Sequence, residues 1–152
     1  MVRNLIFLDI DGVLNTESSL VKGIHICPDK VVLLYEVVKE TDCKVVISSS
    51  WRLLYTLTEI KEILYLSGFR DRYAIIDHTP FIHEFGKKFD RKFSRGFEID
   101  RWIGSRHEVY NYVILDDIDE FLPYQKSRFV HIDSELGLTE NNLENIKKVL
   151  YF

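Results

Sequence analysis

The sequence has little cysteine and no long apolar run. Cys27 and Cys43 are the two cysteines among 152 residues and form no CxxC pair. We therefore expect neither a disulfide framework nor a zinc site, and a reducing cytoplasm as the compartment. No apolar stretch reaches the roughly 20 residues of a bilayer-spanning helix, and the apolar start at 5–8 is too short for a secretory signal. No membrane association is expected.

Charge of either sign is not in large excess. The 20 basic and 24 acidic residues give a formal net charge of -4, which argues against nucleic-acid binding through overall charge. Hydrophobic residues make up 46% and charged residues 29%, a balance typical of globular chains. We find no repeat and no linker, and the length suits one core. We therefore expect a single domain over residues 1–152.

Short apolar runs alternate with stretches of helical period along the chain. The runs are continuous, as in strands that helices cover on both faces; they lie at 5–8, 44–47, 73–76, 112–115 and 129–132. This alternation predicts an α/β fold with a mostly parallel, five-stranded sheet.

Four helices are expected beside these strands. Pro28 begins the first, and Thr58 is the expected N-cap of the second, which ends before Gly68. Ser94 and Thr139 are the expected N-caps of the third and fourth. The segment 81–94 shows no clear period and is predicted to be a loop or an insertion.

Four of the five strands run into polar or acidic residues, among them Asp9, Asp11, residues 48–50 and residues 116–117. In an open parallel sheet the ligand crevice lies outside these strand ends, so we expect the side chains to converge. If the chain stays extended, the carboxylates of Asp9 and Asp11 lie close together and repel each other. Mg²⁺, which prefers oxygen ligands, relieves such repulsion. The alternative is a turn rich in turn-forming residues.

These segments resemble motifs of the haloacid dehalogenase-like (HAD) hydrolase superfamily. The resemblance rests on residues 9–15 (DIDGVLN), residues 48–52 (SSSWR), a cation before the fourth strand, and residues 115–117 (LDD). Order and spacing agree across most of the chain. The resemblance implies a Rossmann-like three-layer sandwich. It also implies a phosphoric monoester hydrolase that uses Mg²⁺ and an aspartyl-phosphate intermediate.

The resemblance also assigns roles to the acids. Asp9 matches the nucleophile that attacks phosphorus, and Asp11 matches the general acid and base. Mg²⁺ would be bound by the Asp9 carboxylate, the Asp11 backbone carbonyl and an acid of the last motif. Asp117 aligns better with that last ligand than Asp116. Asp116 would instead contact the metal ligands and orient them without binding the ion.

The second motif implies a hydroxyl that binds phosphoryl oxygens. Ser49 is the first choice and Ser48 the second, although either can be an ordinary cap or turn residue. Arg52 is a candidate for a two-pronged phosphate contact; the alternative is a solvated side chain.

The third motif implies a cation that stabilises charge on the transferring phosphoryl group. Arg95 occupies the expected place, although the family usually has Lys there. Lys87 and Lys88 are the competing candidates, and a plain surface charge is the alternative.

Few residues remain for a cap domain. The segments 16–27 and 78–94 are too short to fold separately, so we expect little or no cap and a cleft open to large substrates. Seven basic and three acidic residues give 87–106 a net charge of +4. The basic residues are Lys87, Lys88, Arg91, Lys92, Arg95, Arg101 and Arg106.

Aromatic residues are interleaved with this basic segment; they are Phe89, Phe93, Phe97 and Trp102. Such a stripe can track a polyanion and stack bases, or it can pack a helix on the core. The pattern is also similar to HAD domains of RNA-repair proteins and polynucleotide kinase-phosphatases, which remove phosphate from strand ends. The expected partner is thus a phosphorylated substrate, with nucleic acid as a candidate.

Two non-enzymatic readings compete with the hydrolase. A receiver-like regulatory domain places its phosphorylated Asp after the third strand, where Asp77 is a partial match. A degenerate HAD domain would serve only as an interaction module, but the presence of both Asp9 and Asp11 argues against it.

Overall fold

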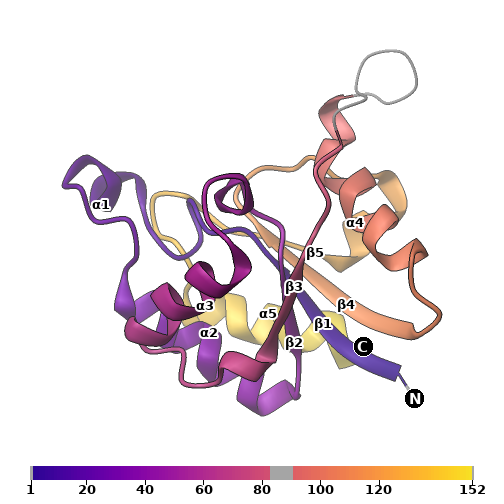
Figure 1. Ribbon diagram of the computed structural model, residues 1–152, viewed down its shortest axis with the longest axis horizontal. Helices are drawn as coiled ribbons and strands as arrows, with labels where there is room; N and C mark the ends of the chain where they lie inside the picture. Colours follow the sequence, from indigo (N-terminus) through magenta and orange to yellow (C-terminus); the bar gives the residue numbers. More distant parts are fainter. Residues whose placement is uncertain (1, 83–90, 152) are drawn as a thin grey trace.

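The sheet contains five parallel strands in the order β3-β2-β1-β4-β5. The structure is a computed structural model that describes residues 2–82 and 91–151 (Figure 1). The strands are β1 (Val2–Leu8), β2 (Lys44–Ile47), β3 (Ile75–His78), β4 (Val109–Asp116) and β5 (Phe129–His131). The parallel α/β sheet predicted from the sequence is confirmed.

The third strand begins two residues later than predicted. Residues 72–74 form a 3-10 turn, η2 (Arg72–Ala74), and the carboxylate of Asp71 accepts a hydrogen bond from the Tyr73 N–H at its start. This local cap competes with strand pairing, so the apolar run at 73–76 is divided between turn and strand.

Five α-helices lie in the described ranges; they are α1 (Glu17–Val21), α2 (Pro28–Thr41), α3 (Leu57–Leu66), α4 (Ser94–Gly104) and α5 (Glu140–Tyr151). Helix α1 was not predicted. Short 3-10 turns accompany them: η1 (Ser50–Leu53), η3 (Arg91–Phe93) and η4 (Pro123–Arg128), besides η2.

Two of the predicted caps were wrong. Thr56, rather than Thr58, caps α3 in a reciprocal capping box with Glu59. Ser94 is the first residue of α4 rather than its cap, and its hydroxyl donates to Glu120 instead. The prediction for Thr139 is confirmed, since its hydroxyl accepts from the N–H of Asn142.

Helices cover both faces of the sheet. Along β1, Ile6 and Leu8 belong to one buried cluster, shared with α2, α3 and α5. Leu5 and Phe7 belong to the other, shared with α4. Figure 1 shows the same division, with α4 on the face opposite the other three helices. The three-layer arrangement is therefore confirmed.

The strand order places a topological switch point between β1 and β4. From β1 the chain runs outward to β2 and β3, and then returns to the other side of β1 to form β4 and β5. Ligands of such sheets bind outside the strand ends at this point. A receiver has the order 2-1-3-4-5 instead, so the sheet excludes the receiver-like reading.

Little chain remains for a cap in the described ranges. Between β1 and α2 the helical content is α1, with five residues. None of the described helices is both long and apolar enough to cross a bilayer.

Candidate active site

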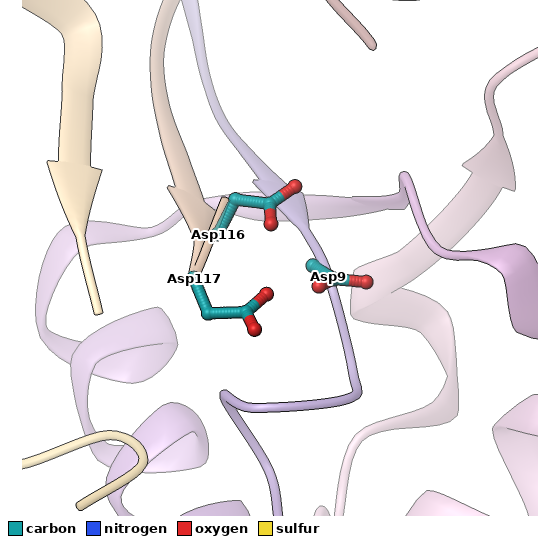
Figure 2. A group of neighbouring side chains, drawn as sticks. All are labelled: Asp9, Asp116 and Asp117. Atoms are coloured by element: carbon teal, nitrogen blue, oxygen red, sulfur yellow. The ribbon is translucent and has the colours of Figure 1, made fainter. Parts of the chain in front are cut away.

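Three carboxylates meet at the switch point. Asp9 follows β1, and Asp116 and Asp117 lie at the end of β4; one oxygen of each lies within 4.8 Å of the others. Figure 2 shows the three side chains grouped together, with the carboxylates of Asp116 and Asp117 on the side that faces Asp9. The hydrogen bond from the Asp9 N–H to the Leu115 carbonyl, 3.0 Å long, ties the two strand ends together.

Burial shifts the pKa of two acids of this cluster, Asp9 and Asp116. Asp9 and Asp116 are 4% and 2% exposed. Burial raises the pKa of Asp9, although the charge of Arg95 opposes the shift. Burial and then the negative charge of Asp9 raise the pKa of Asp116. A divalent cation relieves the repulsion between crowded, poorly solvated carboxylates of this kind. A set of ligands made only of oxygens fits Mg²⁺.

Gly12 allows Asp117 to reach this cluster. The φ of Gly12 is +82°, a conformation that other residues rarely adopt. A Cβ added at Gly12 would lie 2.5 Å from Asp117 Oδ2. Two physical features therefore require glycine at this position of the first motif: the left-handed backbone and the close approach of Asp117.

Arg95 supplies a cation beside the acids. It lies in the first turn of α4, and its Nη1 is 3.6 Å from Asp9 Oδ1 and 3.9 Å from Asp116 Oδ2. Burial lowers the pKa of Arg95, but the charges of Asp9, Asp116 and other acids outweigh burial and leave it above the ordinary value. Nη1 is buried without a hydrogen-bond partner among the described residues. The competing candidates, Lys87 and Lys88, lie outside the described residues.

Asp11 is not a member of the acid cluster, and its backbone is part of a turn rather than extended. Residues 11–14 turn, and the Asp11 carboxylate leaves the acid cluster. Its Oδ1 accepts from Trp51 Nε1 at 3.0 Å and from Asn15 Nδ2 at 2.9 Å. The repulsion that the structure supports is between Asp9 and Asp116 of β4.

The two candidate serines differ in their bonding. Both follow β2 and are buried. The Ser49 hydroxyl caps η1 by accepting from the Trp51 N–H at 3.2 Å. The Ser48 hydroxyl has no hydrogen-bond partner among the described residues. Ser49 was the first choice from the sequence. Among the described residues, however, Ser48 is the one of the two serines whose hydroxyl has no hydrogen-bond partner and can donate to a ligand.

Arg52 is neither solvated nor free for phosphate. Its side chain is 4% exposed and Nη2 lies 2.7 Å from Glu98 Oε2. Nε donates to the carbonyl of Thr79, and Nη1 to the carbonyl of Ser49. Since all three nitrogens donate to protein oxygens, the geometry argues against Arg52 as a phosphate ligand.

Sequence reasoning missed the residues that hold the site in place. Glu98 stands three residues after Arg95 and binds Arg52, while Trp51 and Asn15 anchor Asp11. For Glu98 the available signal was an acid one helical turn beyond the expected cation. For Trp51 and Asn15 no spacing rule pointed to Asp11.

The aromatic stripe is partly a core feature. Trp102 is 3% exposed, packs edge-on against Phe7 and donates its indole N–H to Asp77. It therefore cannot stack an incoming base. Arg91, Lys92 and Arg101 are exposed, whereas the rest of the stripe before residue 91 lies outside the described ranges.

Comparison with known families agrees with this geometry. The model of the HAD domain in Swiss Army Knife RNA repair proteins matches residues 5–143. Neither the curated proteins nor the solved structures gave a match. The matched range includes all five strands, at least in part, together with the three acids and Arg95. The chain therefore belongs to the family of HAD domains found in Swiss Army Knife RNA repair proteins.

Proposed function

We propose that this domain is a Mg²⁺-dependent phosphomonoester hydrolase in which Asp9 carries the phosphoryl group. The observation that supports it is the meeting of three carboxylates, two of them buried, with Arg95 Nη1, which lies near Asp9 and Asp116 and has no hydrogen-bond partner among the described residues. Asp9, Asp117 and the Asp11 carbonyl would hold the ion, with Asp116 beside them. When bound, Mg²⁺ neutralises charge on the acids and the phosphate.

In the first step an Asp9 carboxylate oxygen attacks phosphorus. A P–O bond to Asp9 forms while the bond to the leaving oxygen breaks. Arg95 and the Ser48 hydroxyl offer donors that have no hydrogen-bond partner in the described part of the chain. They would bind the phosphoryl oxygens, whose charge spreads during transfer. In the second step water attacks phosphorus, which releases phosphate and restores the Asp9 carboxylate.

Asp11 moves the protons in both steps. Two donors, from Trp51 and Asn15, occupy its Oδ1, so we assign the transferable proton to Oδ2. Asp11 protonates the leaving oxygen and later accepts a proton from the attacking water. The two anchors fix the carboxylate without occupying Oδ2.

The substrate we propose is a phosphate at a nucleic-acid strand end. The matched family is described by its occurrence in RNA repair proteins. Exposed positive charge for a polyanion lies just before α4, at Arg91 and Lys92, and on α4, at Arg101. Such charges attract the phosphates of a nucleic acid. In the described part of the chain, α1 is the one helix between β1 and α2, which leaves room for a strand at the site.

The test compares hydrolysis by the wild type and Asp9→Asn, with and without Mg²⁺. Substrates are an aryl phosphate and oligonucleotides phosphorylated at the 3′ or 5′ end. We expect Mg²⁺-dependent release that Asp9→Asn loses by orders of magnitude. Asp119→Asn, an exposed acid paired with Lys126, is the matched control. Equal release by Asp9→Asn contradicts the proposal, and release by neither protein favours a non-catalytic module.

A further inference from the structure

A pocket of about 600 Å³ adjoins the Asp11 side of the site. One wall comes from α1 and the loop after it, with Leu20, His25 and Ile26. The other wall comes from the turn between β2 and α3 (Figure 1), with Trp51 and Tyr55 among others. Asp11, which lines the pocket, is two residues after Asp9 of the carboxylate cluster.

Two aromatic rings give this pocket a flat, partly fixed surface. The rings of Trp51 and Tyr55 have centroids 5.3 Å apart and are inclined by 41°. Trp51 is held by the hydrogen bond from its indole N–H to Asp11. Tyr55 is 39% exposed, so its ring is available to a ligand. Ordered rings of this kind bind planar groups at low entropic cost.

The charges divide the site into two parts. Among the described residues that line the pocket, none is Lys or Arg, and Asp11 is the acid. The guanidinium group of Arg95 lies instead at the carboxylate cluster, where its Nη1 is 3.6 Å from Asp9 Oδ1. A phosphate inside the pocket would therefore meet no Lys or Arg among these residues, only the imidazole of His25, whereas an uncharged planar group needs no counter-ion. Because Asp11 is the proposed donor to the leaving oxygen, the pocket lies on the leaving-group side.

We infer that the pocket receives the nucleobase of the nucleotide from which phosphate is removed, stacked against Tyr55 beside Trp51. The inference rests on the proposed function for the position of the phosphate. Stacking of this kind accepts any base, because every base has a π-face. The terminal base would have to leave its neighbours, which an unpaired end does at little cost.

Titration with adenosine, which carries no phosphate, tests the pocket without requiring turnover. The two tryptophans give two indole N–H signals in an NMR spectrum, which a Trp102→Phe variant distinguishes. We expect adenosine to shift the Trp51 signal and leave that of the buried Trp102 in place. Tyr55→Leu should weaken this binding roughly 5- to 150-fold, the range measured for loss of one stacking ring.

Two control variants separate stacking from general effects. Tyr55→Phe keeps the ring and should bind adenosine as the wild type does. Tyr73→Leu removes a tyrosine that is 88% exposed elsewhere and should also bind normally. Absence of a shift at Trp51, or equal affinity in Tyr55→Leu, overturns the inference.

Kinetics extend the test to substrates. We expect Tyr55→Leu to lower the ratio of kcat/KM for an adenosine monophosphate to that for glycerol phosphate, while Tyr55→Phe preserves the ratio. An unchanged ratio in Tyr55→Leu contradicts the pocket but not the phosphatase. If Asp9→Asn hydrolyses both substrates as fast as the wild type, the proposed function fails, and the adenosine titration still decides the pocket.

Discussion

The guanidinium of Arg52 and the carboxylate of Glu98 form a salt bridge of 2.7 Å in the protein interior, with both side chains 4% exposed. The pair joins the turn after β2 to α4, the helix that carries Arg95. Glu98 also accepts from the N–H of Ile82. The cation of the site is thus positioned by a buried ion pair that does not itself touch the acids.

Loss of one partner should destabilise the fold. In Glu98→Gln the buried Arg52 charge loses its counter-ion, and we expect a loss of about 3–5 kcal/mol in the free energy of unfolding. Urea unfolding measures it. Glu62→Gln, which breaks the exposed pair with Arg72, should change stability little. A small effect of Glu98→Gln would show that the pair is dispensable.

Gly12 and Gly23 offer a matched comparison. Both have positive φ, +82° and +77°, but a Cβ at Gly12 meets Asp117 whereas a Cβ at Gly23 meets nothing within 4 Å. Each change to Ala should cost roughly 1–2 kcal/mol of backbone strain. We expect Gly12→Ala alone to weaken Mg²⁺ binding, measured by calorimetry, because it displaces Asp117. Equal Mg²⁺ affinity in the two variants would contradict the assigned role of Asp117.

The sequence was sufficient for the strand ends because their pattern is local. Continuous apolar runs followed by acids identify buried parallel strands whose ends face one crevice. Asp9, Asp116 and Asp117 converge as expected, and Arg95 reaches them from the helix start where the family pattern located a cation.

The supporting contacts depend on tertiary structure that no spacing encodes. Arg52 meets Glu98 across 46 residues, and Trp51 meets Asp11 across 40. The turn at 11–14 places Asp11 where its carboxylate accepts from Trp51 and Asn15, whereas an extended backbone would place it beside the carboxylate of Asp9. The start of β3 differs from the prediction for a local reason. The Asp71 carboxylate accepts from the Tyr73 N–H and caps a 3-10 turn where the strand was expected to begin.

Arg95 should act on the transition state. Its Nη1 contacts two acids and lacks a hydrogen-bond partner among the residues described. We expect Arg95→Met to lower kcat by about 10²–10³-fold, as removal of a charge-stabilising donor does, with a smaller effect on KM. Arg95→Lys should recover part of kcat, and the exposed Arg101→Met should leave kcat unchanged. If kcat is unaltered in Arg95→Met, Arg95 is not the cation that stabilises charge on the phosphoryl group.

The two cysteines should differ in reactivity. Cys43 is 2% exposed, and burial raises the pKa of its thiol to about 11. Only the thiolate reacts, so at pH 8 roughly one Cys43 thiol in a thousand is ionised, and its alkylation should accelerate as the pH rises toward 11. Peptide mapping after iodoacetamide should find Cys27, which is half-buried, modified first. Preferential modification of Cys43 in the folded protein would contradict the burial.

The most direct test of the account is to identify the residue that carries the phosphoryl group. Acetyl phosphate has a leaving group that needs no proton, so Asp11→Asn should still transfer phosphate to the enzyme but should hydrolyse the phosphoenzyme slowly. After acid quenching and peptide mass spectrometry we expect the phosphoryl group on Asp9, and none in the double variant with Asp9→Asn. A phosphoryl group on another residue, or undiminished turnover in the double variant, would contradict the central role of Asp9.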